Sequence, residues 1–302
     1  MKNFEYTTPQ TLREAVKLLA ENGSGARVLA GGTDLIVQMR INKRRPDRVV
    51  DVKNISELNE LSIGSRKGLV IGAAVPCHRI YGDAEICERY PGLVDSASII
   101  GGIQIQGRAT FGGNLCNSSP SADTTPILIA HGAVASIVGP NGKRSVPVEE
   151  FCTGPGTNVL QNGELLVSIV VPLNRKNSAS HYLRFIPRNE MDIAVVGAGA
   201  YVELGGRGKQ FKTVRISLGA VAPTPLFARE ASEELTGKTV NDETIEEAAE
   251  AAKNVAVPIS DMRGPAEYRT HLVGVLVKRA LTGAIARARG KFVANAVQEA
   301  AG

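Results

Sequence analysis

Two glycine-rich segments carry the residue types that bind phosphates and sugars through the backbone. The first reads Leu29-Ala30-Gly31-Gly32-Thr33-Asp34-Leu35, and the second reads Ala109-Thr110-Phe111-Gly112-Gly113-Asn114-Leu115-Cys116-Asn117. Adjacent glycines let the backbone turn sharply and let a ligand come close, because no side chain stands in the way. The hydroxyls and amides beside them can donate hydrogen bonds, and backbone N–H groups at such turns favour anions. We expect the two segments to hold one large dianionic ligand between them.

Each glycine pair alone is most often only a turn, so the surrounding sequence has to support a site. Each segment follows a predicted short strand and precedes an apolar run with a hydroxyl or an acid at its start; Asp123 is the acid in the second case. The spacings Gly-x-Gly-x-x-Gly and Gly-x-x-x-x-Gly-Lys are absent, which disfavours a Rossmann dehydrogenase and a nucleoside triphosphatase. Gly197-Ala198-Gly199 lies inside a strand pattern, and we interpret it as close sheet packing.

Residues suited to a metal site or a catalytic triad are scattered. The four cysteines form no Cys-x-x-Cys pair, which is typical of single reduced thiols rather than an iron–sulfur site within this chain. The four histidines are equally dispersed, and we expect no catalytic residue in the chain itself. These residues are Cys77, Cys87, Cys116 and Cys152, and His78, His131, His181 and His271.

The composition is that of an ordinary globular protein of 302 residues with a net charge of +5. Its densest basic run (Arg40, Lys43, Arg44, Arg45, Arg48) lacks the aromatic platforms of nucleic-acid binders, so we expect no nucleic-acid partner. We interpret this basic run either as a solvated helix end or as a docking patch for an acidic partner. No apolar run approaches the ~20 residues of a membrane span, and the N-terminus has no apolar signal region, which predicts a cytoplasmic protein.

Three units are expected to position the glycine segments. Residues 1–56 predict a helix–strand–helix–strand unit, in which a strand at 27–30 leads into the first segment and a helix follows from Thr33. Residues 57–173 predict a strand at 69–74, helical stretches, the second segment, a helix from Pro126 and a hairpin. Residues 174–302 predict strands first and helices last, which indicates helices on one face of an antiparallel sheet. The fold class is therefore α+β.

The paired segments, together with Ser121-Ala122-Asp123, resemble the FAD motifs of the medium subunit of molybdenum hydroxylases. That family includes carbon monoxide dehydrogenase, bacterial xanthine dehydrogenase and related N-heterocycle hydroxylases. The segment 219–225 resembles a stretch of the family's C-terminal domain, and the closest likeness is to the bacterial xanthine dehydrogenase FAD subunit. The resemblance spans the whole chain and implies a two-subdomain FAD-binding fold of the PCMH type, followed by a C-terminal α+β domain.

The resemblance also implies the cofactor-binding residues. Backbone N–H groups of residues 30–34 and the helix expected at 33–42 would bind the pyrophosphate, and the second segment would complete that cradle. Asp123 would accept hydrogen bonds from sugar or ribityl hydroxyls, Arg184 would lie near the cofactor, and Ile100 would pack against the flavin ring. The implied set is Leu29, Ala30, Gly31, Gly32, Thr33, Asp34, Leu35, Ile100, Ala109, Thr110, Gly113, Asn114, Asn117, Asp123, Leu166 and Arg184. Plain core positions for Ile100 and Leu166, and a surface role for Arg184, are the alternatives.

A relay of electrons is the function that the resemblance implies. Substrate is hydroxylated at a molybdopterin centre on a large subunit, electrons cross two [2Fe–2S] clusters on a small subunit, and FAD on this chain passes them to NAD⁺, a quinone or oxygen. The holoenzyme is expected to be a xanthine or N-heterocycle dehydrogenase, with carbon monoxide dehydrogenase as the alternative. The loop 188–192 aligns with a segment that can lie over the flavin, where its charges could influence access by a nicotinamide.

Two other classes of function stay open at this point. One is a self-contained flavin oxidase, for which His78 is the only candidate for covalent flavin attachment near a plausible loop. The other is a flavoprotein or scaffold without enzymatic activity.

Overall fold

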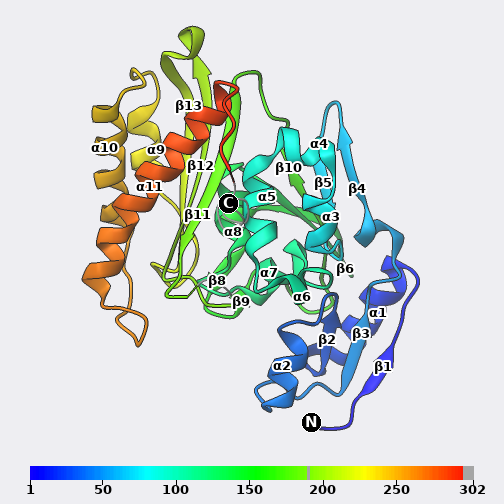
Figure 1. Ribbon diagram of the computed structural model, residues 1–302. Coiled ribbons are helices and arrows are strands. Elements are labelled where there is room, and N and C mark those ends of the chain that lie inside the picture. Colours follow the sequence, from blue (N-terminus) through cyan, green and yellow to red (C-terminus); the bar gives the residue numbers. More distant parts are fainter. Residues whose placement is uncertain (189–190, 295–302) are drawn as a thin grey trace.

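A computed structural model describes residues 1–188 and 191–294 (Figure 1). Three units follow one another along the chain, each built on its own sheet. The N-terminal unit lies at one end of the molecule, the C-terminal unit lies at the other, and the middle unit lies between them. This arrangement confirms the α+β class.

The N-terminal unit is a three-stranded parallel sheet in the order β1-β3-β2. Helix α1 buries Ala15, Val16 and Leu19, which recur at helical spacing, and the Thr11 hydroxyl caps its first turn. Strand β1 was absent from the sequence expectation because its three residues are largely exposed and carry no apolar alternation. The elements are β1 (Glu5–Thr7), α1 (Leu12–Asn22), β2 (Ala26–Leu29), α2 (Leu35–Arg40) and β3 (Arg48–Asp51).

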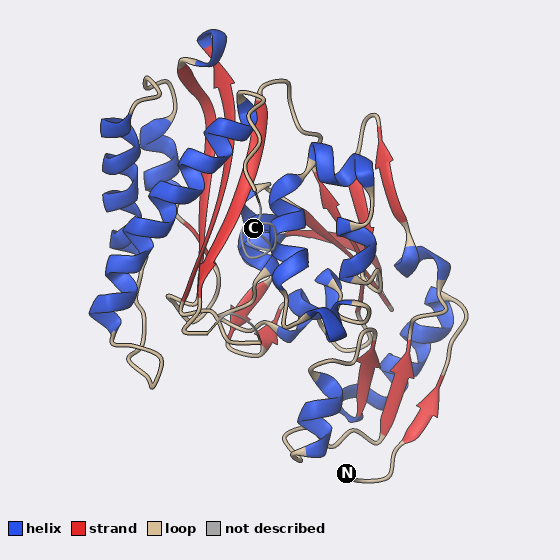
Figure 2. Cartoon of the chain, in the orientation of Figure 1, coloured by secondary structure: helices blue, strands red, loops and turns tan. Residues whose placement is uncertain are grey.

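The middle unit is a five-stranded antiparallel sheet in the order β4-β5-β10-β6-β7, with helices over it (Figure 2). The predicted hairpin at 140–143 joins β6 to β7. Its elements are β4 (Leu61–Gly64), β5 (Gly68–Gly72), α3 (Cys77–Tyr81), α4 (Ala84–Arg89), α5 (Pro91–Ile99), α6 (Ile103–Gln106), α7 (Phe111–Asn117), α8 (Thr124–Ala130), β6 (Val134–Gly139), β7 (Gly142–Pro147), β8 (Cys152–Gly154), β9 (Thr157–Asn158) and β10 (Leu165–Val171).

The C-terminal unit is a four-stranded antiparallel sheet in the order β11-β12-β13-β14. Helices α9 (Arg229–Leu235) and α11 (Ala266–Ala288) cover one face, as predicted, and α10 (Asp242–Ala251) packs on these two helices. The other face packs on α5 and α8 of the middle unit. Its elements are β11 (Ser178–Phe185), β12 (Val196–Gly205), β13 (Gln210–Gly219), β14 (Leu226–Phe227), α9 (Arg229–Leu235), α10 (Asp242–Ala251) and α11 (Ala266–Ala288).

Gly199 of β12 serves the packing of this sheet on the middle unit, and Gly197 leaves room for the Tyr182 hydroxyl of β11. A Cβ on Gly199 would lie 2.7 Å from the Ser217 hydroxyl and 3.3 Å from the backbone of Ile127 in α8. Helix α8 can therefore approach the sheet only where the strand has no side chain. This geometry confirms that the Gly197-Ala198-Gly199 run is sheet packing and no dinucleotide loop.

The second glycine segment differs from its prediction as a loop that follows a strand. It is the short helix α7, and the segment before it is the helix α6. The Thr110 hydroxyl caps α7 by accepting the Gly113 N–H at 2.8 Å, while Phe111 and Leu115 are fully buried. Burial of this apolar face and the cap outweigh the low helix propensity of two glycines. The neighbouring helix α8 starts at Thr124, two positions before the predicted Pro126.

Candidate functional site

The two glycine segments meet at the seam between the N-terminal and middle units. A Cβ on Gly31 would lie 2.0 Å from the Arg108 carbonyl oxygen, so only glycine allows this approach. Nearby, Gln38 of α2 donates through Nε2 to Oδ1 of Asn117 in α7 at 3.0 Å. Segments 79 positions apart in sequence are thereby held side by side.

A groove opens at this seam, and we call it the seam groove. Its volume is about 420 Å³, and it lies where β2 ends, at the carboxyl edge of the parallel sheet. Ligands of open α/β sheets bind at such edges, outside the carboxyl ends of parallel strands. Gly32 adopts a φ of +76°, which turns the chain from β2 towards α2. The lining residues are Leu29, Ala30, Gly31, Gly32, Thr33, Ile36, Val37, Lys53 and Arg108.

The remaining residues of the first segment lie beside the groove rather than in its lining. Asp34 is exposed, and its carbonyl accepts the Gln38 N–H in the first turn of α2. Leu35 is half-buried at the start of the helix. Because α2 spans only six residues, Leu35–Arg40, instead of the expected 33–42, its partial charge is smaller than that of a long helix.

The polar side chains of the second segment have protein partners but keep free donors. The Thr110 hydroxyl accepts the Gly113 N–H, and its own proton remains to be donated. Asn114 accepts the Thr124 hydroxyl through Oδ1 at 2.7 Å, and its amide N–H donors have no partner within residues 1–188 and 191–294. Ala109 is buried and its carbonyl accepts the Cys77 N–H. The segment is thus held by protein partners, and the Thr110 hydroxyl and the Asn114 amide still have protons to donate.

Asp123 and Arg184 form a buried ion pair. Arg184 Nη1 lies 2.8 Å from Asp123 Oδ2, the Tyr182 hydroxyl donates to Oδ1 at 3.3 Å, and the Arg184 side chain is only 6% exposed. Burial raises the pKa of Asp123, and the Arg184 guanidinium opposes that shift. Burial, followed by the charge of Asp123, raises the pKa of Tyr182 well above its usual range, so the phenol stays neutral. The structure therefore gives Arg184 no surface role.

Arg184 also reaches the segment predicted to contact the flavin ring. Its Nη2 donates to the carbonyl oxygen of Ile99 at 2.8 Å, one residue before Ile100. Ile100 caps the end of α5 and is 6% exposed. Leu166 lies in β10 within the main hydrophobic core at 2% exposure, while its neighbour Val167 is half-buried. Ile100 and Leu166 thus belong to the same hydrophobic core, and Ile100 lies in addition next to the Ile99 carbonyl that Arg184 binds.

The described part of the loop 188–192 packs on the residues that follow Ile100. The Met191 N–H donates to the Gly101 carbonyl at 3.3 Å, and the Gln104 amide approaches the Met191 sulfur at 3.5 Å. Asp192 lies 3.6 Å from both Arg188 Nε and Arg263 Nε. Asn189 and Glu190, which belong to the same loop prediction, lie outside the described residues.

Lys53 and Arg108 are lining residues that the sequence analysis missed. Lys53 lies two positions after β3, and the parallel pairing of β2 with β3 brings the ends of both strands to one edge. Arg108 immediately precedes the second glycine segment. The proximity of Arg108 to that segment was the only signal available in the sequence, because the place of Lys53 depends on the strand order.

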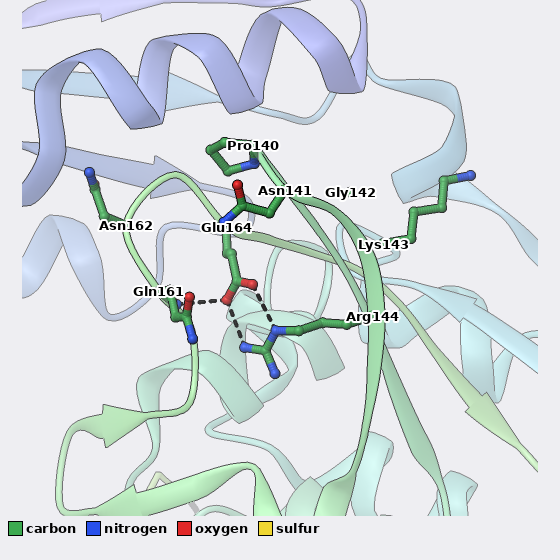
Figure 3. Close-up of a pocket in the computed structure, with 8 residues that line it drawn as sticks. All are labelled: Pro140, Asn141, Gly142, Lys143, Arg144, Gln161, Asn162 and Glu164. Atoms are coloured by element: carbon green, nitrogen blue, oxygen red, sulfur yellow. Dashed lines mark hydrogen bonds and ion pairs between the residues drawn. The ribbon is translucent and has the colours of Figure 1, made fainter.

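A second, smaller pocket lies at the turn between β6 and β7, away from these residues (Figure 3). Its volume is about 60 Å³, and the bidentate ion pair of Arg144 with Glu164, at 2.7 Å for both bonds, occupies its centre. This pair fixes the hairpin against the 161–164 turn, which is a structural role. The seam groove is the better candidate for a large ligand.

The seam groove fits the phosphate-bearing part of FAD. Its floor is backbone from a glycine turn, its two charged side chains are cations, and Thr110 and Asn114 keep donors on the adjoining segment. These are the groups that bind a diphosphate. The chemistry of the donor set therefore agrees with a dinucleotide.

Comparisons with known proteins agree with this geometry. Residues 2–174 match the family described as the FAD binding domain in molybdopterin dehydrogenase, and residues 181–284 match the CO dehydrogenase flavoprotein C-terminal domain. The xanthine dehydrogenase FAD-binding subunit of Escherichia coli O157:H7 is 33% identical over 95% of this chain and 98% of that protein. The carbon monoxide dehydrogenase medium chain of Hydrogenophaga pseudoflava is 35% identical over 94% and 98%.

The fold is shared with solved structures as well. A chain of reconstituted CO dehydrogenase from Oligotropha carboxidovorans superposes with a TM-score of 0.90 at 31% identity, over 95% of this chain and 99% of that one. None of the helices in the described ranges has the length and apolarity to span a lipid bilayer. With both halves of the chain matched, this protein belongs to the FAD-binding flavoprotein subunits of the molybdenum hydroxylase family of oxidoreductases.

Proposed function

We propose that this chain is the electron-output subunit of a xanthine or N-heterocycle dehydrogenase. A large molybdopterin subunit and a small subunit with [2Fe–2S] clusters would be its partners, and NAD⁺, a quinone or oxygen would be the acceptor. The observation that carries the proposal is the seam groove, which the first glycine segment lines together with Lys53 and Arg108, at the place where Gly31 packs against the start of the second segment. Bound FAD supplies the exchange of electrons between one-electron clusters and the acceptor.

The residues of the chain bind and orient the cofactor in this proposal. The backbone of residues 29–33 would donate to the diphosphate, and Thr110 and Asn114 would donate from the facing segment. Ala109, Gly113 and Asn117 would keep that segment in place, as would Asp34 and Leu35 at the start of α2. Arg184 would fix both Asp123 and the Ile99 carbonyl, and so would position Ile100 against the flavin. Leu166 would support this wall from the core.

Carbon monoxide dehydrogenase is the second candidate for the holoenzyme, because a medium chain of that enzyme is 35% identical to this chain. The two candidates share the flavoprotein role and differ in the partner that binds substrate. The choice between them therefore depends on the complete complex.

Purification of the full chain tests the cofactor assignment. We expect yellow protein that releases non-covalent FAD on acid treatment, identified by chromatography of the extract. Gly113→Val should lower the flavin content, because a Cβ there would lie 2.9 Å from the Thr110 hydroxyl, whereas Gly107→Val, with open space around it, should not. Colourless protein that refuses added FAD would contradict the proposal.

Co-expression with the partner subunits tests the holoenzyme. The purified complex is supplied in turn with xanthine, other N-heterocycles and carbon monoxide, and bleaching of the flavin absorbance is followed without oxygen. Bleaching by a purine or an N-heterocycle is the expected result. Bleaching by carbon monoxide alone would assign the second candidate instead.

A further inference from the structure

The diphosphate of FAD carries two negative charges, and the seam groove has to compensate them. The helices that begin beside the groove are short: α2 has six residues and α7 has seven. Helix partial charges arise from aligned peptide dipoles, so such short helices contribute little. Beyond the backbone N–H groups of the glycine turn, compensation has to come from side chains, and Lys53 and Arg108 are the charged residues in the lining that the described ranges provide.

Lys53 is a cation held in a fixed position at the groove. Its Nζ lies 2.5 Å from Asp51 Oδ2, and its N–H donates to Asp51 Oδ1 at 3.0 Å. Asp51 is 5% exposed and also accepts the Tyr6 hydroxyl. An ammonium has three N–H donors, and Asp51 takes one of them. Two donors on a preorganised ammonium thus remain for an anion.

Arg108 is the complementary cation from the middle unit. Its carbonyl oxygen is the atom that meets Gly31, so its backbone is fixed at the seam. Arg108 is exposed, and its guanidinium forms no hydrogen bond or ion pair with any residue of the ranges 1–188 and 191–294. A planar guanidinium with all its donors available is suited to a phosphate.

We propose that Lys53 and Arg108 form a two-cation clamp on the diphosphate of FAD, one cation from each side of the seam. The clamp rests on the proposed function, since it names the residues that neutralise the cofactor. It also explains why Lys53 is tied to a buried acid, because an untethered lysine loses more side-chain entropy on binding. Because Lys53 belongs to the N-terminal unit and Arg108 to the middle unit, the bound diphosphate would link the two units.

Titration of the deflavinated full chain tests the clamp. FAD binding is followed by flavin fluorescence, and ADP, which carries the diphosphate without the flavin, is measured as a competitor. Arg108→Met and Lys53→Met should each weaken FAD and ADP binding about 10-fold, the usual effect of one charge-assisted hydrogen bond. The FAD affinity of the wild type should fall with ionic strength, and less steeply in the variants.

The β4–β5 turn offers matched controls. Arg66→Met and Lys67→Met remove the same charges from exposed residues outside the groove lining, and both should bind FAD as the wild type does. Lys53→Met leaves Asp51 buried without its cation, which could unfold the N-terminal unit. The double variant Asp51→Asn/Lys53→Met removes both charges and keeps the test valid.

The outcomes separate the clamp from the assignment of the cofactor. If the wild type binds FAD but Arg108→Met and Asp51→Asn/Lys53→Met bind FAD and ADP equally well, the clamp is wrong and the FAD assignment stands. The clamp is also wrong if FAD binding weakens while ADP binding and the salt dependence do not change. Failure of the wild type to bind FAD would overturn both proposals.

Discussion

Gly31 shows how one residue type decides whether the two units can meet. Its missing side chain leaves room for the Arg108 carbonyl oxygen, which would lie 2.0 Å from a Cβ. Real Cβ atoms never approach an oxygen so closely, so any other residue has to push the seam apart. The glycine therefore acts through packing between units, in addition to any contact with the ligand.

Gly31→Ala is expected to lower the free energy of unfolding by about 1–3 kcal/mol, the usual effect of overpacking, and to weaken FAD binding. Urea unfolding and flavin titration measure the two effects. Gly107→Ala is the matched control, because a Cβ there meets nothing within 4 Å. Equal affinity and stability of Gly31→Ala and the wild type would show that the seam does not need this glycine.

Arg184→Met is expected to destabilise the protein by about 3–5 kcal/mol, since it leaves the Asp123 carboxylate buried without its cation. The double variant Asp123→Asn/Arg184→Met should recover part of this loss, because the uncompensated charge is gone. Urea denaturation of the three proteins tests the coupling. Equal stability of the single and double variants would argue against an ion pair in solution.

The sequence indicated the individual residues of the site better than their partners. The resemblance placed Asp123 and Arg184 near the cofactor, but their ion pair joins positions 61 apart and depends on how β11 packs on the middle unit. Lys53 was missed for a similar reason. Its place at the groove follows from the parallel order β1-β3-β2, which no local pattern in the sequence specifies.

At the scale of elements, α11 is fastened to α5 by one side chain. Arg287 donates to both carboxylate oxygens of Asp95, at 2.6 and 2.9 Å, and to the Ser180 carbonyl at 2.9 Å. Asp95 is 2% exposed, so the pair is shielded from water and salt. Because α5 ends next to Ile100, this ion pair ties the C-terminal unit to the predicted flavin wall.

Arg287→Met is expected to destabilise the chain by about 3–5 kcal/mol and to weaken FAD binding, because α5 loses an anchor. Guanidinium denaturation and flavin titration are the measurements. Arg289→Met is the control: Arg289 is exposed and donates only to the Gly208 carbonyl among the described residues. Unchanged FAD affinity in a folded Arg287→Met protein would separate α11 from the cofactor site.

Most elements could be predicted because their apolar residues repeat with a clear period. The exceptions have physical causes. Strand β1 has three residues, and α7 contains two glycines, so neither carries a periodic signal. In α7, the Thr110 cap and the burial of Phe111 and Leu115 decide the conformation, and that burial exists only in the folded chain.

At the scale of the molecule, two buried histidines lie where the middle and C-terminal units pack. His131 Nε2 lies 2.8 Å from the Ser180 hydroxyl, and Gly283 of α11 leaves space for the His181 ring. Burial, followed by the charge of Arg215, lowers the pKa of His131 to about 3; burial and Arg287 lower the pKa of His181 to about 3. Both rings are neutral in the folded protein.

This neutrality makes stability depend on pH. The unfolded chain binds protons below about pH 6.5 while the folded chain does not, so stability is complete above that pH and falls as the pH drops towards 3. At about pH 5, each of these two histidines should lower the free energy of unfolding by about 2 kcal/mol. Buried Asp95 and Asp123, whose pKa values burial raises, act in the opposite direction.

The comparison of variants isolates the histidine effect. Urea unfolding at about pH 7 and about pH 5 should show a smaller loss of stability in His131→Gln than in the wild type, whatever its absolute stability. His271→Gln replaces an exposed histidine and should lose as much as the wild type. Parallel losses in all three proteins would contradict the burial argument.

The seam between Gly31 and Arg108 has one more consequence. Neither unit contains the whole groove, so a bound ligand contacts both units, and its binding free energy stabilises their association. A change that separates the two units therefore releases the ligand, and a bound ligand opposes their separation. Flavin supply during biosynthesis should thus set how much of the polypeptide matures.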